Sequence, residues 1–139
     1  MKIRQATKKD ESSISKMFYK LYPKIKVKKD PITIKSIGAS CITLVSEDKE
    51  KITGFVIGTL ITYGPCKYGY IEELFVDESS RRKGVGEKLI NKLLREFGKL
   101  NTWAIFVMTV KNDPIAQSFY KKAGFKKSRG LWLYMENVK

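Results

Sequence analysis

The stretch VDESSRRKGVGEKLI, Val76–Ile90, joins the pattern of an apolar strand directly to that of an amphipathic helix. A helix that begins in this way leaves several backbone N–H groups at its start without intrahelical partners. Because Gly84 and Gly86 have no Cβ, a ligand can approach this main chain closely. The stretch is therefore typical of a pyrophosphate-binding turn, and three cations strengthen the prediction: Arg81, Arg82 and Lys83.

Spacing separates three kinds of phosphate-binding motif. A Walker A loop requires G-x-x-x-x-G-K-[ST], which the chain does not contain. A dinucleotide fingerprint requires G-x-G-x-x-G, and Leu89 stands where its third glycine is needed. The remaining pattern is R-x-x-G-x-G over residues 81–86.

Four helices are predicted around this turn. Thr7 and Asp10 have capping-box spacing before a helix with apolar residues at positions 14, 17, 18 and 21, which Pro23 ends. Asp30 and Pro31 indicate a short second helix that ends near Gly38. A third follows the turn, carries apolar residues from 85 to 97, and is closed by Gly98. The fourth is announced by Asn112, Asp113 and Pro114 and stops at Gly124.

Strands are predicted for the β-branched and aromatic runs between these helices. They cover Ile3–Ala6, Cys41–Val45, Ile52–Ile61, Tyr70–Val76 and Ala104–Val110, with closing strands at Phe125 and Leu131–Met135. The order predicts an α/β fold with a mixed, mostly antiparallel central sheet of six to seven strands and helices on both faces. With 139 residues and no linker or repeat, the chain is expected to form a single domain, 1–139.

Composition limits the class of protein. The N-terminus lacks the apolar core of a signal peptide, and the longest apolar run, Ile52–Tyr63, is too short to cross a bilayer as a helix. A cytoplasmic protein without a membrane partner is expected, with Cys41 and Cys66 reduced. The formal charge of +14 would suit an acidic macromolecule such as RNA, although a solvated basic face or a lysine-biased composition is the more ordinary explanation.

The chain contains no histidine. A Ser-His-Asp or Cys-His relay is therefore excluded, and a Cys41 or Cys66 acyl-enzyme would lack its usual base. Without histidines or a cysteine cluster, we expect no metal site.

The segment Arg81–Gly86 resembles the acetyl-CoA-binding motif of the GNAT (GCN5-related N-acetyltransferase) superfamily. The strand YIEELFV directly upstream and the segment NDPIAQSFYKKAGF, Asn112–Phe125, resemble other signatures of the family, and the element order resembles it over essentially the whole chain. The resemblance implies an acetyl-CoA-dependent N-acetyltransferase in which the amine attacks directly. It also implies that the strand of residues 70–76 splays from that of residues 104–110.

Roles follow from the resemblance residue by residue. It implies that Asn112 fixes the pantetheine of acetyl-CoA, that Tyr120 serves as general acid near the thioester sulfur, and that an N–H of Phe75 or Val76 stabilises the oxyanion. Asn112 could instead be a helix cap, and Tyr120 a packed aromatic. The residues implied in cofactor binding are Phe75, Val76, Arg81, Arg82, Lys83, Gly84, Val85, Gly86, Asn112 and Tyr120.

Glu72 and Glu73 are adjacent on a predicted central strand, so their side chains should point to opposite faces. The strand resembles that of diamine acetyltransferases, which implies Glu72 as base or amine anchor. Alternatively, both acids are surface or salt-bridged residues and ordered water takes the proton.

The expected acceptor is a primary amine: a small cationic, polyamine-like amine, or a protein lysine or N-terminal amine. The alternatives are a nucleic-acid- or ribosome-binding module and a non-catalytic CoA-binding regulator on the same fold. A homodimer is also predicted, paired through exposed terminal strands such as Leu131–Met135.

Overall fold

The computed structural model describes residues 1–24, 31–130, 133–136 and 138. The chain forms two compact units, Met1–Met108 and Thr109–Lys139. A single domain over 1–139 stays a prediction. Within the described residues, no helix combines the length and the apolar character needed to span a membrane.

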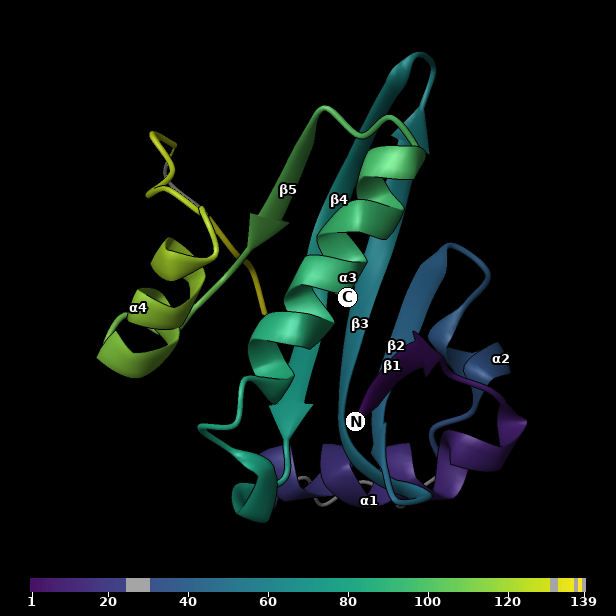
Figure 1. The fold of residues 1–139 in the computed structure, drawn as a ribbon. Helices are drawn as coiled ribbons and strands as arrows, with labels where there is room; N and C mark the ends of the chain where they lie inside the picture. The colour runs from purple at the N-terminus through teal and green to yellow at the C-terminus, as the bar shows by residue number, and fades with distance from the viewer. Residues whose placement is uncertain (25–30, 131–132, 137, 139) are drawn as a thin grey trace. The chain divides into compact units, whose positions relative to one another are not determined.

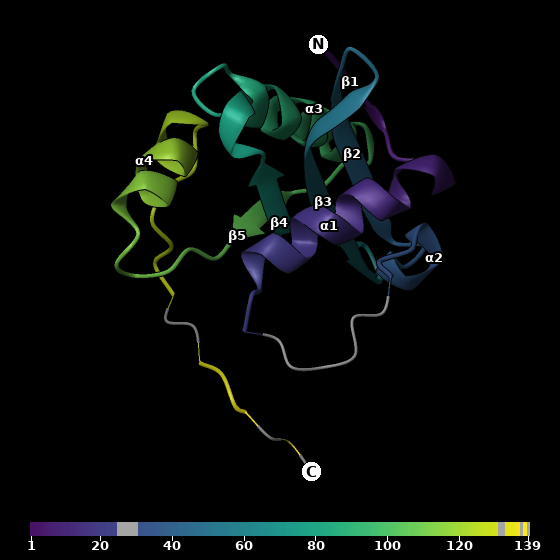
Figure 2. The same cartoon turned by 90° about the horizontal axis from the view of Figure 1, so that it is seen from below.

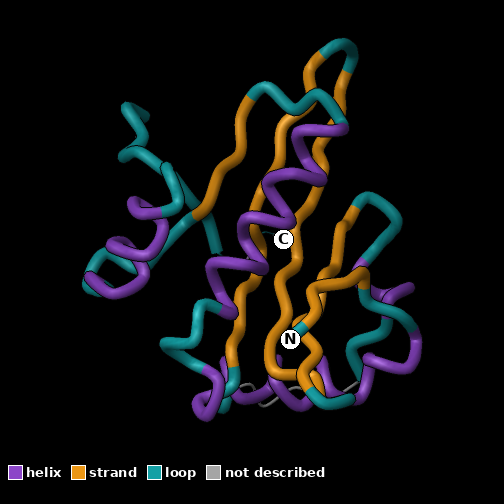
Figure 3. Tube along the Cα trace, viewed as in Figure 1, coloured by secondary structure: helices purple, strands orange, loops and turns teal. Residues whose placement is uncertain are grey.

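The first unit is built on one five-stranded sheet in the order β1-β2-β3-β4-β5 (Figures 1 and 3). Its first four strands pair antiparallel, and β5 joins β4 in parallel. The strands are β1 (Lys2–Gln5), β2 (Cys41–Asp48), β3 (Lys51–Tyr63), β4 (Cys66–Val76) and β5 (Ala104–Val107). The mixed, mostly antiparallel sheet predicted from the sequence is confirmed.

Helices α1 and α3 lie on opposite faces of this sheet, as the view from below shows (Figure 2). The helical elements of the first unit are η1 (Lys8–Asp10), α1 (Glu11–Leu21), α2 (Ile34–Ile37), η2 (Glu78–Ser80) and α3 (Val85–Lys99). The second unit contains α4 (Pro114–Lys122).

The predicted strand count of six to seven is wrong for the residues that the structure describes, which form five strands. Phe125 and Leu133–Met135 are not in strands, and residues 131–132 of the predicted closing strand lie outside the described residues. An apolar run becomes a strand only where a neighbouring backbone takes its hydrogen bonds, and composition cannot report that neighbour. The terminal-strand pairing invoked for a homodimer therefore has no strand among the described residues to support it.

Two predicted helix boundaries differ from the structure. The second helix is capped by Thr33, whose side chain accepts from the Ser36 N–H at 2.9 Å, and the predicted cap, Asp30, lies outside the described residues. Gly98 lies inside α3, and Asn101 takes the left-handed backbone beyond its end, with φ 57°. Both errors arise because several residues near each end could serve as caps.

The core between α1 and the sheet consists of buried apolar side chains. Ile14 and Met17 of α1 pack on strand residues of β2, β3 and β4. Those strand residues are Val45, Phe55, Ile57 and Phe75, and the Phe55 and Phe75 rings stack at 6.2 Å between centroids. This packing fixes the C-terminal part of β4 against α1.

On the other face, α3 approaches the sheet closely because β3 and β4 present glycines to it. A Cβ on Gly58 would lie 2.7 Å from the ring of Phe97 and 2.9 Å from Leu93, and one on Gly69 would lie 2.9 Å from Phe97. Phe97 and Leu93 are completely buried. The position of α3, and so of its first turn, depends on these close contacts.

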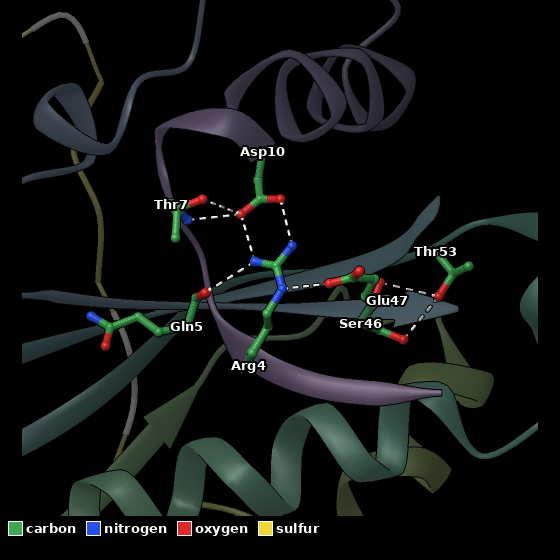
Figure 4. Close-up of polar contacts among 7 residues, drawn as sticks. All are labelled: Arg4, Gln5, Thr7, Asp10, Ser46, Glu47 and Thr53. Atoms are coloured by element: carbon green, nitrogen blue, oxygen red, sulfur yellow. Dashed lines mark hydrogen bonds and ion pairs between the residues drawn. The ribbon is translucent and has the colours of Figure 1, made fainter. Parts of the chain in front are cut away.

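A polar network ties β1 to the start of α1 (Figure 4). The Arg4 guanidinium donates to both carboxylate oxygens of Asp10, at 2.7 and 2.9 Å, and to Glu47 at 2.5 Å. Asp10 also accepts from the Thr7 N–H at 2.7 Å, which completes the predicted capping box. These bonds, chiefly the one from Arg4, lower the pKa of Asp10 to about 2 although its burial opposes the shift.

Candidate functional site

Strands β4 and β5 separate half-way along β4. Their parallel pairing begins at Tyr68 with Ala104 and ends at Ile71 with Val107, whereas β4 continues to Val76. The half of β4 from residue 72 to residue 76 thus has no pairing with β5. This is the divergence of the two strands that the family resemblance implied.

The register of β3 and β4 shows which backbone groups of this half-strand point to the open edge. Opposed residues of an antiparallel pair alternate between hydrogen-bonded and non-hydrogen-bonded. The Asp77 N–H donates to the Thr53 carbonyl at 2.9 Å, so Asp77 and Thr53 form a hydrogen-bonded pair. Val76 and Gly54, the next pair along, are therefore non-hydrogen-bonded, and the backbone of Phe75 is again hydrogen-bonded to β3. The N–H of Val76 is directed away from β3, toward the edge that β5 has left.

The first turn of α3 follows this edge. Gly84 precedes the helix with φ 75° and ψ 8°, and its carbonyl accepts the first helical bond, from the Lys88 N–H at 3.0 Å. A Cβ on Gly84 would meet no atom of the described residues within 4 Å, so the space above the turn is open. The N–H groups of Val85 and Gly86 precede the first helical bond and therefore face a region that suits an anion.

The three cations before Gly84 are all exposed, but they are held differently. The Arg81 Nε donates to the Val76 carbonyl at 3.0 Å, and the Lys83 Nζ donates to the Ser79 carbonyl at 2.8 Å. Arg82 has a left-handed backbone, with φ 58°. Arg81 thereby ties the turn to the end of β4, and all three charges stay beside the helix start.

A β-bulge in β4 corrects the expectation that Glu72 and Glu73 point to opposite faces. Ile57 pairs with Glu73 and Gly58 with Ile71, which leaves Glu72 as the extra residue. An extra residue breaks the alternation of side chains along the strand. Both carboxylates consequently reach the face that α1 covers.

Hydrogen bonds of the two carboxylates establish this shared face. Glu73 accepts from the hydroxyl of Tyr22, which follows α1, and Glu72 accepts from the Thr59 Oγ1 at 2.7 Å. Thr59 in turn contacts the Sγ of Cys41 at 3.3 Å, and Cys41 packs against the core on the α1 side. The structure therefore brings Glu72, Glu73, Tyr22 and Thr59 together beside the open edge of β4.

The environment of Glu73 raises its pKa. Burial raises the pKa of this half-buried carboxyl, the Tyr22 hydrogen bond lowers it, and the charge of Glu72 raises it again. Burial, with the hydrogen bond to Glu73, also raises the pKa of Tyr22 to about 12. Tyr70, two residues before Glu72, has its pKa raised by burial and by the charge of Glu72.

Sequence reasoning missed Tyr22, Thr59 and Tyr70. Tyr22 gave no signal, because a residue at the end of a helix shows no partner 51 positions away. The alternating pattern of β3 placed Thr59 on a face, but the bulge decides which residue of β4 it meets. A buried apolar strand that carries two adjacent acids was the only hint.

The second unit contains the other predicted site residues. Asp113 caps α4 by accepting from the Ala116 N–H at 2.9 Å, so Asn112 is not the helix cap. The ring of Tyr120 contacts Phe119 and Phe125 edge-on, at 5.1 and 5.6 Å between centroids. Gly124, with φ 98°, follows the end of α4 as predicted.

The 1–108 unit thus combines a helix start that suits an anion, an open strand edge with an outward N–H, and two carboxylates on one face. Such a set can hold a phosphate-bearing cosubstrate along β4 and a cationic group beside it. Among the described residues, no group of three His, Cys, Asp or Glu side chains could hold a metal ion.

Comparison with known proteins gives a family and a fold. The model of the acetyltransferase (GNAT) family matches residues 11–125. GCN5-related N-acetyltransferase 6, chloroplastic, of Arabidopsis thaliana is 30% identical over 77 residues, which are 55% of this chain and 27% of the relative. The D-amino-acid N-acetyltransferase of Saccharomyces cerevisiae is 35% identical over 63 residues, 45% of this chain and 39% of the relative.

The chain therefore spans well under half the length of these two curated relatives. Among solved structures, an aminoglycoside N-acetyltransferase in complex with CoA has a TM-score of 0.83 and 18% sequence identity. That likeness covers 99% of this chain and 95% of the other. At this identity it shows a shared fold.

Proposed function

Because the chain belongs to the acetyltransferase (GNAT) family, we propose that it transfers the acetyl group of acetyl-CoA to a primary amine. The nitrogen lone pair attacks the thioester carbonyl, the C–S bond breaks, and the thiolate takes a proton to leave as CoA. One observation carries the proposal: the open half of β4 carries two carboxylates on one face and leads into the glycine turn before α3.

The proposed cosubstrate site consists of the turn and the strand end. The pyrophosphate of acetyl-CoA would accept from the N–H groups of Val85 and Gly86, with Arg82 and Lys83 supplying charge. Arg81 would act by holding the turn against the Val76 carbonyl. An aminoglycoside N-acetyltransferase of the same fold binds CoA, which supports this assignment.

Val76 is the proposed oxyanion donor. Of the two candidates, Phe75 and Val76, the register leaves only the Val76 N–H directed to the open edge. A donor aimed at the place where negative charge develops stabilises the transition state more than the ground state.

The two carboxylates are proposed to divide the handling of the amine. Glu72 is exposed and would anchor an ammonium group, whereas Glu73 is half-buried with a raised pKa and would take the proton directly or through water. Tyr120 is proposed as the acid that protonates the thiolate, and Asn112 as a pantetheine contact. A Tyr120→Phe change would then lower kcat with little change in acetyl-CoA affinity.

Calorimetric titration with acetyl-CoA tests the cosubstrate site without knowledge of the acceptor. Gly84→Glu should abolish saturable binding because it places a negative charge above the helix start. Gly64→Glu is the matched control: Gly64 is also exposed, has φ 51° and an open surrounding, but lies between β3 and β4. Wild-type protein that fails to bind micromolar acetyl-CoA, or equal loss in both variants, would contradict the proposal.

Release of free CoA thiol with a primary amine tests the carboxylates. Glu73→Gln should lower kcat by about two orders of magnitude, and Glu72→Gln should chiefly raise KM for the amine. If both variants keep wild-type kcat and KM, the pair has no part in catalysis.

A second candidate function, binding of an acidic macromolecule, is favoured by one feature. A groove of about 890 Å³ runs along the outer side of α1 and is lined by Lys8, Lys9, Lys16 and Lys20. We propose RNA as its polyanion. Lys8→Glu with Lys9→Glu should weaken salt-sensitive RNA binding, and unchanged affinity would refute this second function.

A further inference from the structure

On the sheet face that extends from Glu72 and Glu73 away from α1, the described strand residues of β3, β4 and β5 include no basic side chain. In register, the strand residues directed to it are Thr59, Ile61 and Tyr63 on β3, Cys66, Tyr68 and Tyr70 on β4, and Ala104 and Phe106 on β5. None of these eight is lysine or arginine, although the chain has 28 such residues against 14 acids. Strand residues without a cation beside two carboxylates, in a chain this basic, form a surface complementary to a cationic ligand.

Four aromatic rings form one cluster on this face. Tyr68 lies at its centre, with ring centroids 5.6 Å from Phe106, 6.4 Å from Trp103 and 6.4 Å from Tyr63, all in edge-on or inclined geometry. Trp103 and Tyr63 are 66% and 60% exposed, so the rest of the 1–108 unit leaves them uncovered. Exposed rings of this kind attract ammonium groups through their negative faces.

The cluster is continuous with the carboxylates along β4. Tyr70 stands between Tyr68 and Glu72 on the same face, and the charge of Glu72 acts on it directly. Glu72 follows Tyr68 by four positions along the strand, which corresponds to a length on the order of 10 Å. A ligand that engages both places must therefore be extended.

We infer that the ring cluster of Tyr63, Tyr68, Trp103 and Phe106 is a second acceptor subsite, which holds a remote cationic group of the amine. The inference rests on the proposed acetyl transfer and narrows its acceptor. The reacting nitrogen lies at Glu72 and Glu73, and a second ammonium on the order of 10 Å away lies over the rings. The substrate class is an extended diamine or polyamine rather than a monoamine.

The test compares 1,8-diaminooctane with n-octylamine, which have the same chain and differ in the second ammonium group. For wild-type protein, kcat/KM for thiol release should be at least tenfold higher with the diamine. Tyr68→Leu and Trp103→Leu should each lower the diamine value roughly fivefold and leave the octylamine value within twofold. Tyr19→Leu, on α1 outside the cluster, is the aromatic control.

A binding readout separates this inference from the proposed function. In Trp132→Phe protein, Trp103 is the one remaining tryptophan of the sequence, so its fluorescence reports the subsite without turnover. Quenching of the Trp103 fluorescence at lower concentrations of diamine than of octylamine supports the subsite. If in addition neither amine is acetylated, only the proposed acetyl transfer is refuted. Equal kcat/KM for both amines together with equal quenching overturns the subsite and leaves the transferase standing.

A further outcome also overturns it. If Tyr68→Leu and Trp103→Leu change the oligomeric state in light scattering but leave the ratio of the two amines unchanged, the cluster is a contact between copies of the chain.

Discussion

The hydroxyl of Tyr22, directly after α1, donates a hydrogen bond to the carboxylate of Glu73 in the middle of β4. This bond joins the end of a helix to a strand 51 residues later, next to the bulge that turns Glu72 to the same side. It opposes the rise in the pKa of Glu73 that burial causes. The proton affinity of the proposed base is thus set in part from outside the sheet.

Tyr22→Phe should move the acidic limb of the kcat/KM profile to higher pH. Loss of the donated bond leaves burial and the charge of Glu72 less opposed, so the pKa of Glu73 rises and the carboxylate forms at higher pH. The measurement is the pH dependence of thiol release with a fixed amine. In a Glu73→Gln background, Tyr22→Phe should leave the acidic limb of the profile unmoved. A movement of that limb would mean that a group other than Glu73 causes it.

Arg81→Ala should raise KM for acetyl-CoA roughly tenfold, because the turn loses its bond to the Val76 carbonyl along with one charge. Arg81→Lys keeps the charge without the guanidinium fork and should recover only part of the loss. Isothermal titration with acetyl-CoA should give the highest affinity for wild type, a lower one for Arg81→Lys and the lowest for Arg81→Ala. Equal affinity of the lysine variant and wild type would mean that charge alone accounts for the role of Arg81.

Gly58→Ala should destabilise the protein by about 1–3 kcal/mol, because the added methyl would lie 2.7 Å from the buried ring of Phe97. Gly98→Ala is the control within α3: a Cβ there meets nothing within 4 Å, and alanine favours a helix by about 0.5–1 kcal/mol. Urea unfolding of the two variants should therefore give changes of opposite sign. Two changes of the same sign would show that close contact at Gly58 is not the cause.

Asp10→Asn should lower the free energy of unfolding by about 2 kcal/mol at pH 7, since the folded-state pKa of about 2 lies below the ordinary value of 3.8. A depressed pKa gives stability that is present above the unfolded value and lost as the pH falls through the folded one. The difference in free energy of unfolding between wild type and Asp10→Asn, measured by urea titration, should accordingly become smaller from pH 4 toward pH 2. Asp48→Asn, at a carboxylate 53% exposed, should change stability by less than about 0.5 kcal/mol.

The sequence predicted elements better than it predicted pairings. Periodicity identified α1 and α3, and the Thr7 and Asp10 capping box is present, although it caps η1 rather than α1. The bulge at Glu72 could not be predicted, because an extra residue in a strand leaves the apolar pattern of its neighbours intact. Of the proposed site, the glycine turn could be predicted because the residues that form it are adjacent in the sequence.

The hydrogen-bond partners of Glu72 and Glu73 could not be predicted from the sequence. Tyr22 and Thr59 meet them only through long-range packing and register. The terminal strands failed for a related reason, since Leu133–Met135 has apolar character but no described neighbour that takes its backbone bonds. Side-chain contacts and strand pairings between residues far apart in the sequence leave no mark on its local pattern.

Helix α3 serves two purposes at once. Its buried side, with Phe97 and Leu93 against glycines, holds one face of the sheet, and its first turn is the proposed phosphate site. A ligand that binds only the folded turn therefore adds its own binding free energy to the stability of the core, in proportion to the logarithm of its concentration. If acetyl-CoA binds the turn as proposed, excess acetyl-CoA would offset part of the stability that a substitution at Gly58 removes.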